Sequence, residues 1–332
     1  MNNFVMAIRH IMEKQHGKDI QRLAAVTVEN HEHSLVLCEV QNDSNSNEQL
    51  ENLCNKCIEP IISTCYRCCE CNYSLHLTCA QLPNELKHPG HEEHTLKLVH
   101  ISKVWEIIGC RACQFYTNGY FFECEICDYR LDVKCALLPT KIVHKSHKHA
   151  LLQNYFQKSL ITHWKYRGCL NCNGCGNRIW SSTYSFSCEP CNFYSDHACA
   201  LLPHCVNHKW DKHSLILCFP PFTDHPEEIY CEICEEEIHP KYWHYRCREC
   251  DQSFHPNCIP RLGESRNMKF GRSIKVVGHP HPITSVRQGE FRSSCGSCNE
   301  SLYGQRAFKC ASCKYSLCFD CVPDLVDSGK LC

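Results

Sequence analysis

Residues 54–79 read CNKCIEPIISTCYRCCECNYSLHLTC, and this stretch predicts the fold. It holds two Cys-x-x-Cys pairs, and a His-x-x-Cys pair begins four residues after the second of them. Cysteine pairs at such spacing are typical of tetrahedral zinc sites. The stretch therefore predicts a small module that is built around bound metal.

The same pattern occurs five times along the 332-residue chain, at intervals of roughly 55 to 70 residues, which is the mark of a repeat architecture. Each copy opens with His-x-Leu or His-x-Ile, continues with the two cysteine pairs and ends in a final ligand pair near a proline. The candidate ligands that all copies share are His33, Cys54, Cys57, Cys68, Cys71, His76 and Cys79 in the first; His94, Cys110, Cys113, Cys124, Cys127, Asp132 and Cys135 in the second; His149, Cys172, Cys175, Cys188, Cys191, Asp196 and Cys199 in the third; His213, Cys231, Cys234, Cys247, Cys250, His255 and Cys258 in the fourth; and His281, Cys295, Cys298, Cys310, Cys313, Cys318 and Cys321 in the fifth.

Two tetrahedral sites need eight ligands, so each copy lacks one. A histidine stands nine residues after the last cysteine of the first three copies, and Val28 occupies the matching position before the first copy. We therefore expect each late histidine to close the module before it. The closing ligands predicted on this basis, with the best candidates for the irregular fourth and fifth copies, are His88, His144, His208, His279 and Cys332.

Four further polar residues precede the opening histidines by two or three positions. They are alternative ligands, but we expect them to support the ligands or to lie on the surface. These residues are His31, His91, His147 and Asp211.

The composition favours metal over disulfides. The chain has 33 cysteines and 23 histidines, and only zinc gives a reason for both to be enriched together. The apolar stretch Phe4–Ile8 is too short for a signal-peptide core, and no run approaches the ~18 apolar residues of a membrane span. We therefore expect an intracellular protein of the cytoplasm, the nucleus or both.

The charge pattern argues against a nucleic-acid partner. The formal net charge is −1, and no run of five basic residues occurs. Zinc held by thiolates makes the loaded protein more acidic still, which disfavours binding to phosphate backbones. The sequence makes no prediction of the oligomeric state.

Modules of this size are too small to fold on apolar burial alone. A structural zinc site contributes about 10–16 kcal/mol, so the metal takes the place of a large core. We expect short antiparallel strands, a short C-terminal helix and irregular loops in each module, hence tandem zinc-stabilised α+β modules. An aromatic residue two positions before each second cysteine pair is expected to form the small core: Tyr66, Phe122, Phe186, Tyr245 and Phe308.

The predicted organisation is an N-terminal extension followed by five zinc modules. The boundaries are 1–28 for the extension and 29–88, 89–144, 145–208, 209–279 and 280–332 for the modules.

The order of these ligands over residues 31–332 resembles the phorbol-ester/diacylglycerol-type zinc fingers of protein kinase C, and the CALLP segments resemble the divergent cysteine/histidine-rich version found in plant families. The resemblance implies cross-braced sites with about two zinc ions per module and about ten in total. In module one it implies one ion on His33, Cys68, Cys71 and His88, and another on Cys54, Cys57, His76 and Cys79. Asp132 and Asp196 stand where the family has histidine, and a carboxylate can also bind zinc.

Catalysis finds little support in the sequence. A catalytic zinc keeps an open coordination position, whereas these modules offer four protein ligands for nearly every ion. No glycine-rich phosphate loop, HExxH helix or GxSxG elbow is present. We therefore predict that the protein is not an enzyme.

The favoured function is a recognition or adaptor protein of intracellular signalling or the stress response that binds a protein partner. The first alternative is binding to diacylglycerol or an anionic phospholipid membrane, which the resemblance implies through a groove between two loops. Only module five, with Gly304 and Gln305, carries similar residue types, and they are out of register. Chromatin-reading and ubiquitin-ligase-like cross-braced fingers are further alternatives, but their ligand orders differ from this one.

Six cysteines are left over: Cys38, Cys65, Cys69, Cys169, Cys205 and Cys218. They are expected to be small buried or tolerated side chains, and the alternative is a redox-sensing role.

Overall fold

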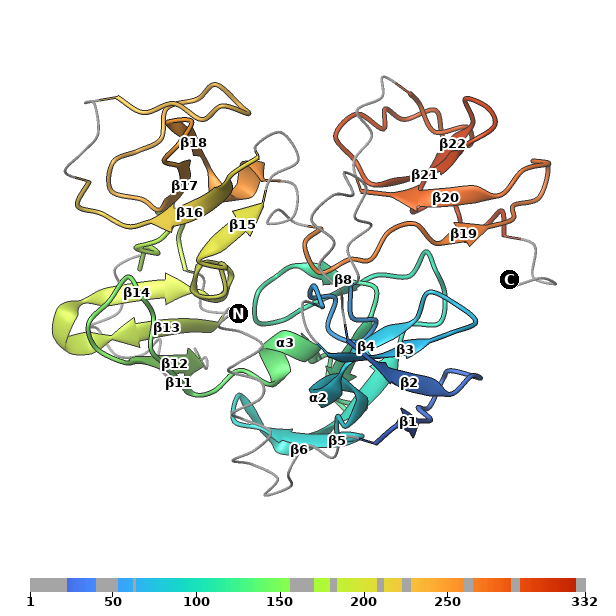
Figure 1. The fold of residues 1–332 in the computed structure, drawn as a ribbon, viewed down its shortest axis with the longest axis horizontal. Helices are drawn as coiled ribbons and strands as arrows, with labels where there is room; N and C mark the ends of the chain where they lie inside the picture. The colour runs from blue at the N-terminus through green and yellow to red at the C-terminus, as the bar shows by residue number, and fades with distance from the viewer. Residues whose placement is uncertain are drawn as a thin grey trace.

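The structure is a computed structural model that describes residues 23–39, 53–61, 64–155, 170–179, 184–207, 212–222, 228–259, 265–287 and 293–326. Within these ranges it contains five four-stranded antiparallel sheets, one for each copy of the repeat, and one two-stranded hairpin. The sheets of modules four and five form two upper lobes, and the first three modules lie below them (Figure 1).

The strands are short, and each sheet uses the same parts of its repeat. Module one has β1 (Ala25–Val26), β2 (Leu35–Cys38), β3 (Cys65–Cys68) and β4 (Ser74–His76); module two has β5 (Glu85–His88), β6 (His91–His100), β9 (Tyr120–Glu123) and β10 (Arg130–Asp132); module three has β11 (Lys141–Ile142), β12 (Leu151–Tyr155), β13 (Tyr184–Cys188) and β14 (Phe193–Asp196); module four has β15 (Cys205–Asn207), β16 (Ser214–Cys218), β17 (His244–Cys247) and β18 (Gln252–Phe254); and module five has β19 (Ser273–Ile274), β20 (Ile283–Val286), β21 (Ala307–Cys310) and β22 (Ser316–Cys318). The separate hairpin pairs β7 (Ile108–Gly109) with β8 (Tyr116–Thr117).

The first strand of each sheet lies before the opening histidine. Strand β5 pairs with β6, with Leu86 opposite Leu96, although the predicted boundary placed residues 85–88 in module one. Strands β11, β15 and β19 are likewise paired with the strand that follows them. The sheets thus divide the chain several residues earlier than the predicted boundaries, because the tail of each copy supplies the edge strand of the next module.

The aromatic core of each module is confirmed. The residues at the predicted position are fully buried, at 0 % exposure in all five modules, and lie on the third strand of each sheet. The hydrophobic residue of the His-x-Leu or His-x-Ile motif is equally buried, for example Leu35 and Ile283. Because side chains alternate along a strand, this face covers the core while the other face meets solvent or a neighbouring module.

A single helical turn follows the last strand in the first three modules. These turns are α2 (Leu77–Ala80), α3 (Val133–Ala136) and α4 (His197–Ala200), and each contains the last cysteine of its copy. In module four a 3-10 turn, η4 (Pro256–Cys258), follows the last strand instead. Another 3-10 turn, η3 (Glu189–Cys191), lies at the second cysteine pair of module three. Among the described residues of module five, residues 319–321 form a turn without a helix.

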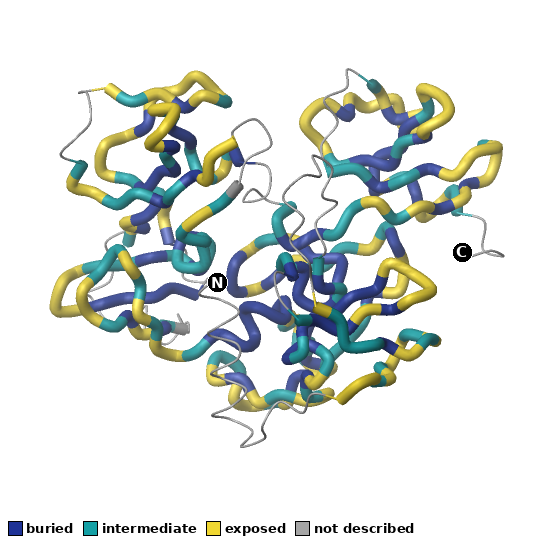
Figure 2. Tube along the Cα trace, in the orientation of Figure 1, coloured by how far each residue is buried: buried dark blue, intermediate teal, exposed yellow. Residues whose placement is uncertain are grey.

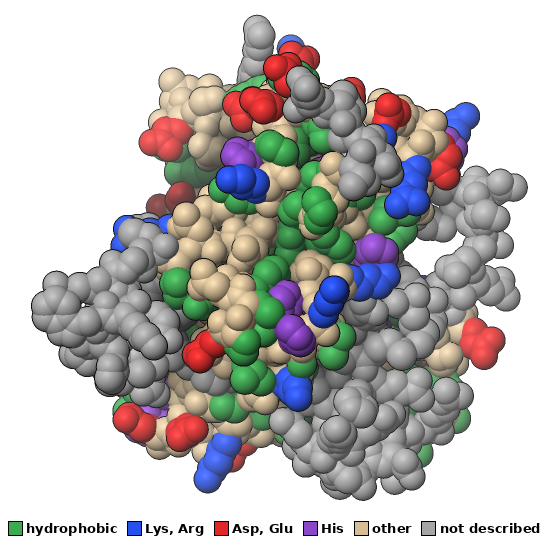
Figure 3. Space-filling model, turned by 90° about the vertical axis from the view of Figure 1, so that its left-hand side faces the viewer, with side chains coloured by type: hydrophobic (Ala, Val, Ile, Leu, Met, Phe, Trp, Pro, Cys, Tyr) green, Lys and Arg blue, Asp and Glu red, His purple; other side chains and the backbone are tan. Residues whose placement is uncertain are grey.

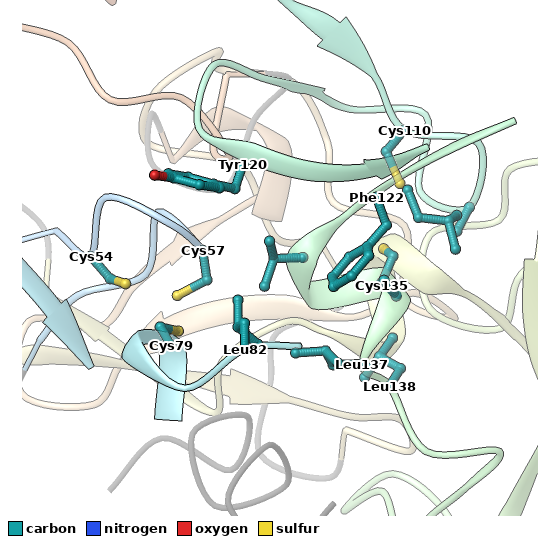
Figure 4. Packing of buried hydrophobic residues seen from close by; sticks show 14 of the residues in the cluster. Cys54, Cys57, Cys79, Leu82, Cys110, Tyr120, Phe122, Cys135, Leu137 and Leu138 are labelled. Carbon is teal, nitrogen blue, oxygen red and sulfur yellow. The ribbon is translucent and has the colours of Figure 1, made fainter. Parts of the chain in front are cut away.

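The modules pack against one another through shared cores. One cluster of buried side chains runs from Leu35 in module one to Cys188 in module three, and a second joins modules three and four. Leu82 lies near Leu137 between the first two modules (Figure 4). The burial is therefore continuous across the lower part of the molecule (Figure 2).

Residues 265–270, called the central segment below, connect modules four and five and contact the first three modules. Met268 is 0 % exposed, and the Arg266 guanidinium lies 4.1 Å from the ring centre of Phe115 in module two. Lys269 Nζ donates hydrogen bonds to Asn55 Oδ1 at 2.9 Å and Asn72 O at 3.2 Å in module one. The array is thus tied together by a short stretch of chain outside any sheet.

No helix within the described ranges is long and apolar enough to cross a membrane.

Candidate metal centres

Cysteine, histidine and aspartate side chains gather in two interleaved groups per module. In module one, the first cysteine pair meets the final ligand pair, while the second cysteine pair meets histidines near the opening of the repeat. Groups whose ligand atoms all lie within 4.8 Å of one another include His31, His33, Cys68 and Cys71; Cys54, Cys57, His76 and Cys79; His91, His94, Cys124 and Cys127; His147, His149, Cys188 and Cys191; and Cys231, Cys234, His255 and Cys258. This interleaving is the cross-braced order.

The distances within the groups fit zinc. Zinc bonds of about 2.3 Å to sulfur and 2.0–2.1 Å to nitrogen, at tetrahedral angles, place sulfur about 3.6 Å from nitrogen and about 3.8 Å from a second sulfur. His76 Nδ1 lies 3.4 Å from Cys57 Sγ and 3.7 Å from Cys79 Sγ. His94 Nδ1 lies 3.3 Å from Cys127 Sγ. A single ion fits at the centre of each group with little movement.

Polar atoms buried without a partner also point to a cation. His33 Nδ1 and His147 Nε2 are buried and form no hydrogen bond, although both belong to these groups. The other ring nitrogen of His33 lies 3.1 Å from Glu70 Oε2. A carboxylate behind a metal-binding histidine fixes the tautomer and directs the free nitrogen to the ion. Glu70 is therefore a supporting residue that the sequence did not suggest.

In module one, the electrostatics favour a positive charge within the group formed by Cys54, Cys57, His76 and Cys79. Burial opposes protonation of His76, but the thiolates of Cys57 and Cys54 outweigh it and raise the pKa of His76 to about 12. His76 Nε2 lies 3.2 Å from the carbonyl oxygen of Pro60, so Nδ1 faces the sulfurs. A zinc ion supplies the positive charge that a proton would otherwise provide, because thiolate is the form that binds the metal.

The predicted closing histidines His88 and His144 lie elsewhere. His88 is 2 % exposed, accepts a hydrogen bond from Gly90 N at 3.1 Å on Nδ1, and stacks on Tyr184 of module three with ring centres 6.0 Å apart. His144 stacks on Trp243 of module four with ring centres 4.9 Å apart. The spacing rule was therefore misleading: these histidines recur because they pack at junctions between modules.

His279 also lies in a different module from the predicted one. Its Nε2 is 3.6 Å from Cys313 Sγ, and its ring centre is 5.5 Å from that of His281, so it belongs to module five and not to module four. The other predicted closing ligands, His208 and Cys332, lie outside the described residues, as does Asp211.

The histidine before each opening histidine takes the place assigned to the late one. In four modules its ring stacks on the aromatic side chain two residues after the second cysteine pair, with ring centres 4.2–4.6 Å apart: His31 on Tyr73, His91 on Tyr129, His147 on Phe193 and His279 on Tyr315. In module four the matching residues are Asp211 and Gln252, and neither is aromatic. This joint occurrence of histidine and aromatic residue is the signal that could have identified the eighth ligand.

Asp132 and Asp196 each perform two roles. One carboxylate oxygen of Asp132 accepts from the backbone N–H of Cys135 at 2.9 Å and caps α3, while the other lies 3.2 Å from Cys113 Sγ. Asp196 does the same with Cys199 N at 2.6 Å and Cys175 Sγ at 3.2 Å. His197, beside Asp196, points away and its Nε2 lies 2.9 Å from Gln153 Nε2. Aspartate therefore fits the group and adds a helix cap that histidine cannot provide.

Modules four and five contain similar arrangements. His213 Nδ1 lies 3.2 Å from Cys250 Sγ, which follows Cys247 in the second pair of module four. In module five, Cys298 and Cys318 sulfurs are 4.0 Å apart. The backbone N–H of the first residue in the final pair lies 3.4 Å from the first cysteine sulfur in modules two to five: Asp132 to Cys110, Asp196 to Cys172, His255 to Cys231 and Cys318 to Cys295. Such bonds stabilise thiolate, the form that zinc requires.

The metal group of module two is joined directly to the central segment. Asn267 Nδ2 donates to Asp132 Oδ2 at 3.2 Å, and Asn267 Oδ1 accepts from Lys134 Nζ. Lys134 is 5 % exposed and forms an ion pair of 2.6 Å with Glu59 of module one. Three parts of the chain that are distant in sequence therefore meet at the Lys134 ammonium, and Asn267 links this point to the Asp132 carboxylate.

The C1 domain family matches three segments of the chain, residues 29–80, 89–136 and 208–259. Searches of curated proteins and of solved structures found no match. C1 domains bind two zinc ions each, and the paired groups described above fit that requirement. Zinc is therefore the cofactor of these modules, and four protein donors around an ion leave no position open for a substrate.

Proposed function

The chain is a tandem C1-domain protein, and from this premise we propose that it is a non-catalytic recognition or adaptor protein of intracellular signalling or the stress response that binds a protein partner. C1 domains are zinc-binding modules that often act in signalling, bind diacylglycerol or protein partners, and are generally non-catalytic. The proposal selects a protein partner over a lipid, and it places the protein in the cytoplasm, the nucleus or both.

The observation that carries the proposal is the burial of the loop between the two cysteine pairs of module two. The resemblance to diacylglycerol-binding fingers implies that lipid enters beside this loop. Here Thr117 and Asn118 are only 2 % and 4 % exposed. Asn118 Nδ2 donates to Lys269 O at 2.8 Å, and Lys269 N donates to Asn118 Oδ1 at 2.8 Å. The tip of the loop, at Thr117 and Asn118, is thus used to hold the central segment and does not face solvent, whereas Gln114 and Tyr116 of the same loop are exposed.

The corresponding loops of two other modules also disfavour an anionic membrane. In module one, Ile58 is 3 % exposed and packs so closely on Gly119 that a Cβ there would lie 2.9 Å from Ile58 Cδ1. In module four, residues 235–237 are three consecutive exposed glutamates. Acidic side chains repel anionic headgroups.

The face of the molecule that Figure 3 presents has the mixed character of a protein-binding surface. On the side of the molecule that Figure 3 presents, hydrophobic side chains run through the middle, with His, Lys and Arg among them, and Asp and Glu side chains lie mainly towards the edges. Apolar patches rimmed by polar residues are typical of protein interaction sites. This pattern supports the choice of a protein partner.

Module five favours the alternative, diacylglycerol-dependent membrane binding. Its loop between the cysteine pairs carries Tyr303, which is 70 % exposed, followed by Gly304 at a φ of +69°. An exposed aromatic ring at a loop tip can enter the interface of a membrane. Any lipid binding by this array is therefore expected to depend on Tyr303.

Co-sedimentation of the zinc-loaded protein with liposomes tests the proposal. We compare phosphatidylcholine vesicles, vesicles with added phosphatidylserine, and vesicles with both phosphatidylserine and diacylglycerol. The protein is expected to stay in the supernatant in all three cases. Diacylglycerol-dependent pelleting that Tyr303→Ser abolishes would replace the proposal with the membrane-binding alternative.

A further inference from the structure

Two cysteines outside the metal groups described above face each other across a strand pair of module one. Cys38 is the last residue of β2, Cys65 is the first residue of β3, and the register places them directly opposite. Directly opposed residues of an antiparallel pair project their side chains from the same face. This proximity could not be read from the sequence, in which 26 residues separate the two.

The backbone spacing suits a disulfide. The N–H of Leu37 donates to Ala24 O beside β1, so the amide and carbonyl groups of Cys38 face β3 and the pair is of the hydrogen-bonded type. Cα atoms in such pairs lie about 5.5 Å apart, which is a common separation for disulfides. Their Cβ atoms lie at the wide end of the range for opposed residues, about 5.5 Å, which is about 1 Å more than a disulfide prefers. A bond here would carry strain, and strained disulfides are the easily reduced ones.

We propose that Cys38 and Cys65 form a reversible disulfide when the protein meets a low-molecular-weight disulfide such as glutathione disulfide. The two cysteines differ in access, because Cys38 is half-buried and Cys65 is 0 % exposed. Cys38 is therefore the thiol that the small disulfide reaches first.

The exchange proceeds in two balanced steps. The Cys38 thiolate attacks one sulfur of glutathione disulfide, forms a mixed disulfide and releases one glutathione thiolate. The deprotonated Cys65 thiol then attacks Cys38 Sγ, forms the Cys38–Cys65 bond and releases the second glutathione thiolate. Two protein thiols are oxidised and one glutathione disulfide is reduced to two glutathiones.

The bond would act next to a metal group of module one. Cys65 lies opposite His76 on its other side, across β3 and β4. The closed loop would contain Cys54 and Cys57, the first cysteine pair of that group. Oxidation would therefore pin the end of the inner strand pair, β2 and β3, beside His76.

Module four supplies an internal control. Cys218 occupies the same place as Cys38, at the end of the second strand, but the residue opposite is His244. Cys218 is half-buried, like Cys38. We expect it to stop at the mixed disulfide with glutathione, because the residue across the strand has no thiol to complete the exchange.

The experiment treats the zinc-loaded full-length chain with glutathione disulfide, alkylates the remaining thiols and maps the peptides by mass spectrometry. We expect a Cys38–Cys65 cross-linked peptide that dithiothreitol reverses, together with glutathionylated Cys218. In Cys65→Ser, Cys38 should accumulate as the mixed disulfide. Persistent glutathionylation of Cys38 in the unmutated protein, or a cross-link that forms only after zinc is removed, would overturn the proposal.

Discussion

Replacing His31 with alanine is expected to remove one zinc ion from module one. His31 Nε2 lies 3.8 Å from Cys71 Sγ, and its ring stacks on Tyr73 with ring centres 4.2 Å apart. A structural zinc site contributes about 10–16 kcal/mol, so each of four donors accounts for about 2.5–4 kcal/mol, or about a hundredfold to a thousandfold in zinc affinity. Loss of the stacking adds about 0.5–1.5 kcal/mol. Native mass spectrometry counts the ions, and competition with a chromophoric chelator measures the affinity.

His88→Ala is the matched control, because it removes a histidine that recurs with similar regularity but lies in a junction. The ring of His88 is buried against Tyr184 of module three, so its removal leaves a cavity and lowers the melting temperature. The zinc count should not change. If His88→Ala lost an ion while His31→Ala kept every one, the assignment of the eighth ligand would be refuted.

Three further predictions concern the metal group of module two. Asn267→Leu removes the three hydrogen bonds that the side chain makes there, with Asp132, Cys113 and Lys134, and should destabilise the protein by about 2–4 kcal/mol in thermal unfolding, whereas Leu at the exposed Asn177 should change little. Asp132→His should keep the zinc count in native mass spectrometry but cost about 1–3 kcal/mol of stability, because the cap of α3 and the hydrogen bond from Asn267 are both lost. Cys113→Ser should abolish the protection of the central segment against amide hydrogen exchange. An equal loss of protection in β20–β22 of module five would contradict a specific coupling between the metal group of module two and the central segment.

The sheets and cores could be predicted because their determinants are local. The second cysteine pair marks the end of the third strand, and the alternation of side chains then selects one inward-facing residue, such as Phe186 or Phe308. The cross-braced order was implied by the family resemblance, and the groups in the structure follow it. The edge strands before the predicted module starts were not foreseen, because a two-residue strand such as β19 has too little sequence to identify it.

The eighth ligand could not be found by counting ligands, because two kinds of histidine recur with similar regularity. His88 and His144 recur because each fills a junction between modules, which is a property of how the array packs and not of any single repeat. His31 and His91 recur because each stacks on a tyrosine beside a metal group. The aromatic residue two positions after the second cysteine pair distinguishes the metal-binding histidines from the junction histidines, and it stands about 40 residues away in sequence.

The two aspartate-containing groups have a further property in common, which is contact with the central segment at their helical turns. Asn267 donates to Asp132 itself, and Arg266 Nη1 donates at 3.2 Å to Ala198 O in α4, the helix that Asp196 caps. Histidine at either position could offer one nitrogen to the metal, but its second nitrogen would point away from the group, as His76 Nε2 does toward Pro60. A carboxylate has enough lone pairs to face the metal, cap the helix and accept from a neighbouring segment at once.

The aspartates therefore have a physical explanation that the repeat alone does not contain. In modules two and three the final ligand pair also forms part of the joint between modules. Its first residue, Asp132 or Asp196, must therefore accept hydrogen bonds in several directions. Because the same carboxylate faces both the metal and Asn267, loss of zinc from module two should weaken the attachment of the central segment. The array is on this reasoning less independent than a string of separate modules, and its central joint depends on a metal site.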